Sequence, residues 1–245
     1  MKIYKVFFLL LVSTFIALGQ NKVNQNVEVT YGVKINEEVL KEKTSNKVRF
    51  QQIKNSLYGI EEVEFQLMAD KTSSLFKLKE QMSSDNDNNS QRVITAVRGN
   101  AIYYTRDSIL IRKKDVFGEE MLIQDIKKEY NWEISKEQKI ILGHMCYKAT
   151  GYYNSYDKNG EDLKVDVYAW FAPGMPISAG PIDLNGLPGL ILEASVNPRF
   201  VYYAKNLNLN PTDFEIVKPR APKTINEQEY EVIVKDVLET IRERG

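Results

Sequence analysis

The residues best suited to hold a metal or to act as a nucleophile lie together at His144 and Cys146. The chain has one His and one Cys, which excludes almost every zinc site built only from these residue types. On a strand, the spacing His144-x-Cys146 places both side chains on one face, compatible with copper or zinc. A third ligand would have to be a carboxylate, another chain, or Met145 from the opposite face. The alternative interpretation of Cys146 is a buried structural thiol, because no second cysteine exists for a disulfide.

Two acidic loops begin with the spacing of a calcium site and then depart from it. In the loop that starts at Asp85, Ser90 and Ala96 stand where an EF-hand needs Gly and a bidentate Glu. The loop that starts at Asp157 fails at the same two positions, and its Asn159-Gly160 step predicts a hairpin turn instead. We therefore expect no metal and no cofactor. The sequence also has no Gly-x-Ser-x-Gly elbow and no phosphate-binding loop.

The amino-acid composition argues against further classes of protein. The 245 residues include 33 Lys+Arg and 33 Asp+Glu, and this balance argues against a nucleic-acid partner, which would require a basic excess. With 43% hydrophobic residues, the chain can bury a core of its own and is expected to form one globular domain.

The most distinctive segment runs from Gly180-Pro181 to Gly186, Leu187, Pro188, Gly189, Leu190 and Ile191. Pro188-Gly189 suits the centre of a type II turn, with Pro fixing φ at the first position and Gly supplying a positive φ at the second. Leu187 precedes a proline and is expected to be extended, and Leu190 and Ile191 begin the next strand. The segment predicts a rigid apolar turn that enters a core strand.

The elements that would position these residues are mostly strands. Alternation predicts a first strand at 27–33, an interrupted helix at 37–58, and short strands from 61 to 124, including one at Val93–Val97. Residues 147–153 should pair antiparallel with 163–171 across Asn159-Gly160. In that second strand Phe171 lies on an apolar face, and Tyr168 and Trp170 lie on the other face. The strands at 190–196 and 199–207 should form another hairpin.

The carboxyl-terminal part is predicted to be a connector followed by a helix. Residues 217–223 are basic and rich in proline, which disfavours a regular helix or a central strand. Residues 224–227 resemble a capping box, and Tyr230, Val234, Val237, Leu238 and Ile241 form one apolar stripe at helical spacing. That stripe should dock on a sheet face. Together these elements predict an α+β domain with a large antiparallel sheet and helices packed on one face.

The amino-terminal residues predict export. Lys2 and Lys5 precede an apolar run at 6–18, and small residues lead to an expected cleavage after Gly19. The run is shorter than a membrane span, and no later apolar run approaches that length, so no transmembrane span is expected in the mature chain. We expect residues 1–19 to be a signal peptide and residues 20–245 to be one exported domain, in the periplasm or associated with the outer membrane.

Residues 186–191 spell GLPGLI, and the chain resembles the GLPGLI family of exported Bacteroidota proteins. The resemblance also includes Trp132, the segments 139–149 and 168–177, and Gly180-Pro181. His144 departs from the aromatic residue that this family usually has there. The family implies no established activity or catalytic residue. Its strand order is similar to that of periplasmic lipoprotein-carrier proteins, which implies a curved, incomplete β-barrel around an apolar cavity.

Two hypotheses of function follow from these observations. The first is a non-enzymatic envelope binding protein for a lipid, another apolar ligand, or an outer-membrane or envelope protein partner, with Tyr168, Trp170, Leu187 and Pro188 as ligand-binding residues. The second is a metal-handling protein or an enzyme centred on His144 and Cys146. The first is favoured because the chain offers few acid–base and metal-ligating groups.

Overall fold

The computed structural model describes residues 26–44, 46–79, 88–156 and 162–244. The predicted signal peptide at 1–19, most of the first acidic loop and the Asn159-Gly160 turn lie outside the described residues. Within these ranges, no helix combines the length and apolarity that a membrane span requires.

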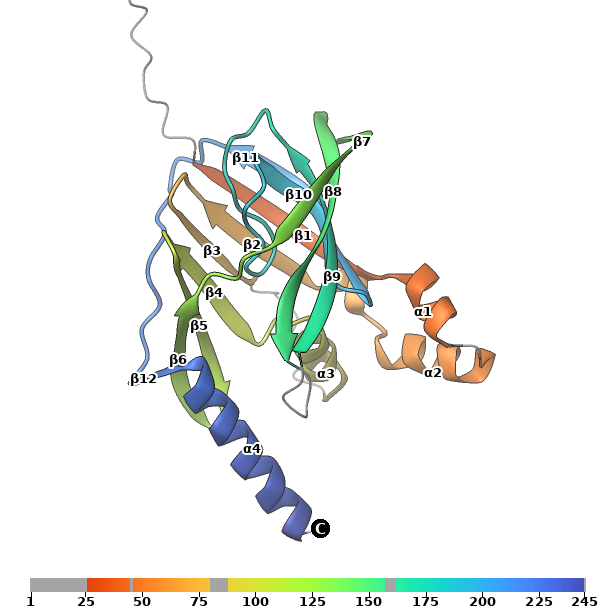
Figure 1. Cartoon of the computed structure of the whole chain (residues 1–245), viewed down its shortest axis with the longest axis vertical. Helices are drawn as coiled ribbons and strands as arrows, with labels where there is room; N and C mark the ends of the chain where they lie inside the picture. Colours follow the sequence, from red (N-terminus) through yellow and green to blue (C-terminus); the bar gives the residue numbers. More distant parts are fainter. Residues whose placement is uncertain (1–25, 45, 80–87, 157–161, 245) are drawn as a thin grey trace, which may run out of the picture.

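One sheet of twelve strands dominates the molecule (Figure 1). Its strands are β1 (Val27–Ile35), β2 (Glu64–Ala69), β3 (Ser73–Leu78), β4 (Ala101–Arg106), β5 (Ile109–Val116), β6 (Glu119–Ile126), β7 (Asn131–Ile141), β8 (His144–Tyr156), β9 (Asp162–Ala172), β10 (Leu190–Asn197), β11 (Phe200–Leu209) and β12 (Lys223–Asn226).

The sheet follows the order β12-β6-β5-β4-β3-β2-β1-β11-β10-β9-β8-β7. Every pair is antiparallel except β12 and β6, which are parallel. Because β12 and β7 do not pair with each other, the sheet does not close. The prediction of a large, mainly antiparallel, open sheet is therefore confirmed, and the fold as a whole is mostly β.

The predicted antiparallel pairing of 147–153 with 163–171 is confirmed as the hairpin of β8 and β9. Tyr147 lies opposite Phe171, and Tyr153 lies opposite Val165. The predicted faces are also observed, because Val167 and Phe171 are buried in the core while the alternate residues point to the other side. Alternation locates these strands correctly because one face of the pair is buried and the other is not.

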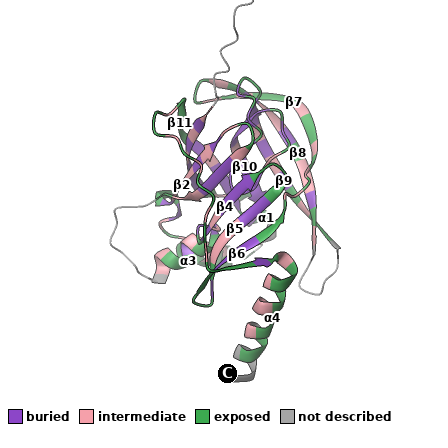
Figure 2. Ribbon diagram, turned by 90° about the vertical axis from the view of Figure 1, so that its left-hand side faces the viewer, coloured by how far each residue is buried: buried purple, intermediate pink, exposed green. Residues whose placement is uncertain are grey.

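Side chains from both halves of the sheet meet in one hydrophobic cluster. It includes residues of β1–β5 and of β8–β11, together with Ile182, Leu184 and Leu187 from the connection between β9 and β10. Phe65 and Phe76 stack within it with their ring centroids 4.9 Å apart. Figure 2 shows the buried residues concentrated on the strands. This cluster holds the β9–β10 connection against the sheet.

The segment Val93–Val97, predicted as a strand, belongs instead to a helix and its end. Helix α3 (Asn88–Ala96) places Val93 and Val97 one turn apart, and both are buried in the main cluster. Residues four apart share a helix face, so the packing of two valines outweighs the preference of β-branched residues for strands. The prediction was wrong because propensity was the only signal available.

Three further α-helices and one short 3₁₀ helix lie at the margins of the sheet. The interrupted helix expected at 37–58 is confirmed as α1 (Glu37–Lys43) and α2 (Lys47–Ser56), followed by the short 3₁₀ helix η1 (Ile60–Glu62). Helix α4 (Glu227–Arg244) ends the described chain, and Figure 1 shows it running away from the strands.

The start and the docking of α4 differ from the prediction. Residues 224–226 belong to β12, and the capping box is formed by Asn226 and Glu229, whose side chains each accept the other's backbone N–H. Tyr230 and Ile233 pack against a small cluster around Ile123. The side chains of Leu238 and Ile241 lie outside the description. Only the first turns of α4 are thus seen to contact the sheet, and docking of its whole stripe is not confirmed.

Candidate functional site

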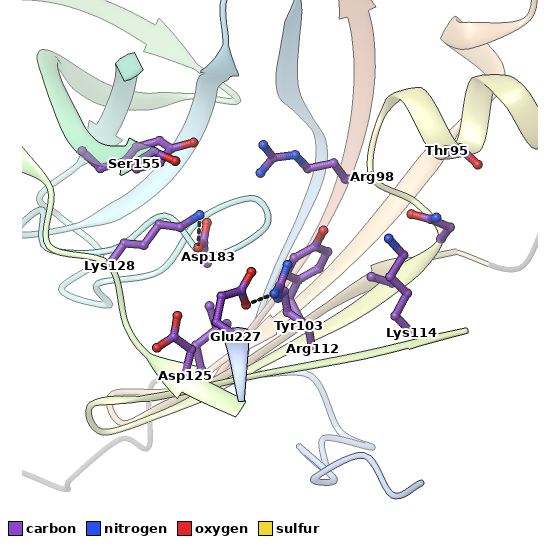
Figure 3. A pocket seen from close by; sticks show the side chains of 14 residues that line it. Thr95, Arg98, Tyr103, Arg112, Lys114, Asp125, Lys128, Ser155, Asp183 and Glu227 are labelled. Atoms are coloured by element: carbon purple, nitrogen blue, oxygen red, sulfur yellow. Dashed lines mark hydrogen bonds and ion pairs between the residues drawn. The ribbon is translucent and has the colours of Figure 1, made fainter. Parts of the chain in front are cut away.

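A charged pocket lies among β4, β5, β6, β8 and the start of α4 (Figure 3). Its cavity measures about 350 Å³. The lining contains four cations and three carboxylates, beside the phenols of Tyr103 and Tyr153. The charged residues are Arg98, Arg112, Lys114, Lys128, Asp125, Asp183 and Glu227.

Asp183 reaches the pocket because the backbone before it has an unusual conformation. Ile182 has a φ of +64°, in the left-handed region that β-branched residues rarely adopt. Its side chain is only 1% exposed in the core, and this packing offsets the backbone strain. Close packing also requires glycine at position 180, because an added Cβ there would lie 2.8 Å from Ile191 Cδ1. The strained turn therefore delivers Asp183 into the cavity.

Asp183 is held there as a buried anion. Its Oδ2 lies 3.1 Å from Lys128 Nζ, and the Tyr130 hydroxyl donates to its Oδ1 at 3.0 Å. Burial by itself would raise the pKa of Asp183, but Lys128, Arg98 and the Tyr130 hydroxyl outweigh burial and hold this pKa below its ordinary value. The carboxylate is therefore charged at neutral pH.

Arg98 enters the pocket from the end of α3. Its φ is +55°, at a helix end where Gly is the usual residue. Its side chain points into the cavity, as Figure 3 shows. Burial alone would lower the pKa of Arg98, but Tyr103, Tyr153 and Asp183 raise it above the ordinary value. Arg98 forms no ion pair with any carboxylate of the described residues.

The first turn of α4 forms one wall of the pocket. Glu227 forms an ion pair with Arg112, and the Lys114 ammonium donates to the Tyr230 hydroxyl at 3.0 Å. Arg112 Cζ and Lys114 Nζ lie 5.4 and 5.5 Å from the centroid of the Tyr230 ring. Two of the four cations are thus balanced by carboxylates, whereas Arg98 and Lys114 are not paired with an acid in the described chain.

Sequence reasoning did not identify this pocket, although two of its signals were present. Gly180-Pro181 was recognised as distinctive, but Asp183, which follows directly, was not. Gly99 follows Arg98 at the end of helix α3, in a region where the sequence predicted only short strands. A glycine beside a charged residue at a helix end is the signal that could have pointed to Arg98.

The four predicted ligand-binding residues do not meet at one place. Tyr168 and Trp170 lie on the outer face of the sheet, where Lys139 Nζ is 4.3 Å from the Trp170 ring centroid. Leu187 is 2% exposed in the main cluster, and Pro188 is exposed. Their role in binding stays a prediction, and Tyr168 lines a cavity on that outer face.

The GLPGLI segment is a tight connection, but not of the turn type predicted. Gly186 has a φ of +87°, and its N–H donates to Ser178 Oγ at 2.8 Å. Gly189 does not have a positive φ, so a type II turn centred on Pro188-Gly189 is wrong. Instead, a Cβ on Gly189 would lie 2.4 Å from the Ala172 carbonyl oxygen. This glycine is required for close approach, which local turn rules do not reveal.

His144 and Cys146 lie on the same strand, at the end of the sheet. Cys146 is fully buried, its Sγ donates to the His144 carbonyl oxygen at 3.5 Å, and burial raises the pKa of its thiol to about 11. His144 is half-buried. A protonated, enclosed thiol is a poor nucleophile and a poor metal ligand.

We expect native Cys146 to react with N-ethylmaleimide at least about 100-fold more slowly than an exposed cysteine at pH 7.5, because little thiolate forms and access is closed. The rate is measured by mass spectrometry, with the urea-unfolded chain as the control. Labelling of the native protein at the unfolded rate would contradict a buried thiol.

Comparisons with known proteins give a partial family match. A family model described as a protein of unknown function (Porph_ging) matches residues 154–193. The match includes Gly180-Pro181, Asp183 and the GLPGLI segment, and it does not confirm the GLPGLI family name. No curated protein matches the chain.

Solved structures provide likenesses at low identity. PNGF-II in its P21 crystal form has a TM-score of 0.50 and 13% identity over 85% of this chain and 33% of that one. The C2 form gives a TM-score of 0.49 and 13% identity over 86% and 32%. An uncharacterised conserved protein from Thermus thermophilus has a TM-score of 0.35 and 5% identity over 84% and 92%. The chain thus spans about a third of PNGF-II, and the likeness concerns the fold alone.

Proposed function

We propose that the chain is an exported, non-enzymatic binding protein whose ligand enters the charged pocket and carries an anionic group. The observation that carries this proposal is Arg98, a guanidinium inside the pocket without an acidic partner in the described chain. A planar guanidinium is suited to a carboxylate, phosphate or sulfate, which it can bind through two parallel hydrogen bonds.

Backbone strain supports a binding role for this pocket. Arg98 and Ile182, the residue before Asp183, both have positive φ. A non-glycine residue in the left-handed region costs roughly 1 kcal/mol. Such strain gathers at functional sites, where the surrounding structure holds a side chain in position for a ligand. The same turn chemistry with glycine would be more stable, so stability does not explain Arg98.

Other groups in the lining of the pocket also favour an anionic ligand. Burial raises the pKa of Tyr103 to about 12, so its hydroxyl remains a hydrogen-bond donor at neutral pH. Lys114 adds a second cation without an acidic partner among the described residues. Asp183 pairs with Lys128 and accepts from Tyr130, and it acts on Arg98 through its charge without forming an ion pair with it.

The proposal refines the expectation of a carrier with an apolar cavity. Side chains from both halves of the sheet belong to one hydrophobic cluster, and this shared cluster supports a curved, carrier-like sheet. The same cluster occupies the interior, however, which leaves a cavity of about 350 Å³ with a charged lining. Such a space suits a small acid or a charged headgroup better than an acyl chain. Export to the periplasm or outer membrane remains part of the proposal, supported by residues 1–19.

Arg98→Gln is expected to weaken binding of the anionic ligand about 30-fold or more, because a charge-assisted pair in a partly dry pocket is lost. Isothermal titration calorimetry with phosphate, sulfate and small mono- and dicarboxylates identifies a binder. The amides of the same carboxylates serve as neutral probes.

Arg106→Gln is the matched control, since Arg106 is exposed and does not line the pocket. The proposal fails if acids and amides bind equally, if Arg98→Gln binds the acid as well as the unmodified protein, or if no probe binds.

A further inference from the structure

A groove on the outer face of the sheet is separate from the charged pocket. Its cavity measures about 600 Å³ and is bordered by α1 and by strands β7–β10. None of its lining residues lines the charged pocket. Its lining includes Val39, Glu42, Glu133, Tyr152, Asp166, Tyr168 and Pro198.

Strand register explains why these side chains share the groove. Glu133 of β7 lies opposite Thr150 of β8, which lies opposite Tyr168 of β9, and Tyr168 in turn faces Ser195 of β10. Residues in such a cross-strand row point to one face of the sheet. The parallel row contains Asn131, Tyr152 and Asp166. Two neighbouring rows thus form the floor, and Val39 and Glu42 of α1 form a wall.

The charged residues that line the groove are all acidic, and Lys164 lies beside it with its Nζ 4.6 Å from the Tyr152 ring centroid. Glu42, Glu133 and Asp166 line it, and no Lys or Arg does. None of the three carboxylates forms an ion pair within the described part of the chain. On the same face, by contrast, Glu137 and Glu193 are paired with Lys148 and Lys139. The two acids with a lysine partner thus lie outside the groove, whereas the three acids in its lining have no such partner among the described residues.

The rest of the lining offers apolar contact. Val39, Tyr168 and Pro198 contribute apolar surface beside the carboxylates. Burial, followed by the charges of Glu193 and Glu38, raises the pKa of Tyr168 to about 12, so its hydroxyl is a donor to a partner's carbonyl group. Glu133 also belongs to β7, one of the two edge strands of the sheet among the described residues, so the groove borders a strand edge along which an extended chain can lie.

We infer that this groove binds an extended segment of a partner protein in which basic and apolar side chains alternate. Alternation in an extended chain presents lysines or arginines to the three carboxylates and apolar groups to Tyr168 and Pro198. The three carboxylates repel an acidic segment, and the opposite charge of a basic segment speeds its association. The inference concerns a site other than the anion pocket and does not depend on it.

The test uses fluorescence anisotropy with a fluorescein-labelled peptide of alternating lysine and leucine and its glutamate–leucine counterpart. The full mature chain should bind the basic peptide and not the acidic one, with affinity that falls as salt rises. Glu133→Gln with Asp166→Asn should weaken binding about tenfold at low salt. Glu119→Gln with Asp213→Asn is the matched control, because it removes the same charge from exposed positions outside the groove.

Several results would overturn the inference. They are binding of neither peptide, equal binding of both, or equal loss in the groove and control variants. Loss of peptide binding in Arg98→Gln would assign the peptide to the charged pocket instead. A salt-sensitive dimer, seen by sedimentation and abolished only by Glu133→Gln with Asp166→Asn, would assign the groove to a second copy of the chain. Unchanged thermal unfolding of each variant shows that the comparison reports binding rather than folding.

Discussion

Replacing Asp183 by Asn is expected to lower the free energy of unfolding by about 3 kcal/mol, because it breaks a buried charge cluster from one side. Lys128 lies 3.1 Å from the carboxylate, and Arg98 also favours its charged form. Without the anion, both cations remain in a partly dry site, and the Tyr130 hydroxyl exchanges an ionised acceptor for a neutral one. The loss is measured by urea unfolding at pH 7.

The effect should depend on pH with a defined sign. Because the pKa of Asp183 is lowered in the folded chain, its contribution is present above the pKa of the unfolded chain, near 3.9. It is lost as the pH falls through the folded value. The difference between the unmodified protein and Asp183→Asn should therefore narrow below about pH 4.

Asp125→Asn is the control for this prediction. Asp125 lines the same pocket but is exposed and forms no ion pair among the described residues, so its replacement should change stability by less than about 0.5 kcal/mol. Equal effects of the two substitutions, or a difference that persists unchanged at pH 3, would argue against a buried ion cluster at Asp183.

Gly189→Ala is expected to destabilise the protein by at least about 3 kcal/mol, at the upper end of the cost of overpacking. The added Cβ would lie 2.4 Å from the Ala172 carbonyl oxygen and 2.9 Å from Pro173 Cα. These are backbone atoms and cannot turn aside as a side chain does. Because Ala172 pairs with Leu190 at the start of β10, relief of the contact requires the strands to separate. Thermal and urea unfolding measure the effect.

Gly174→Ala provides the comparison. An added Cβ there meets nothing within 4 Å, and its φ is not positive. Alanine should therefore leave the free energy of unfolding unchanged or raise it slightly, because alanine reduces the conformational entropy of the unfolded chain. If Gly189→Ala were as mild as Gly174→Ala, close approach would not be the reason for glycine in this segment.

Local sequence patterns predict the strands whose two faces differ. The pairing of β8 with β9 was predicted from the Asn159-Gly160 step between two β-rich runs, and the buried face of β9 was predicted because Val167 and Phe171 lie on the same side of the strand. Helix α3 was missed because Val93 and Val97, four residues apart, lie on the same face of either a strand or a helix. Only the folded core, which buries both valines, shows which of the two the segment forms. The pairing of β12 with β6 depends on Ile225 joining Val116, Met121 and Ile123 in one cluster. No local signal specifies that pairing.

The charged pocket was beyond prediction for a different reason. Arg98, Lys128 and Asp183 come from separate segments with no fixed spacing, so no motif describes them. Each is an ordinary surface residue by type, and only the topology makes them neighbours. The groove was partly foreseen, because alternation places Tyr168 on the outer face, but its acidic character arises from strands and a helix that meet only in the folded chain.

The position of β1 has a consequence for how the chain folds during synthesis. Val27 pairs with Ala69 of β2 on one side and with Leu209 of β11 on the other. The middle of the sheet thus joins the beginning of the described chain to a strand near its end, and contacts of such long sequence separation form slowly. Until residue 209 has emerged from the ribosome, one edge of β1 has no partner. The nascent chain must keep that edge from pairing with other chains until β11 has been synthesised.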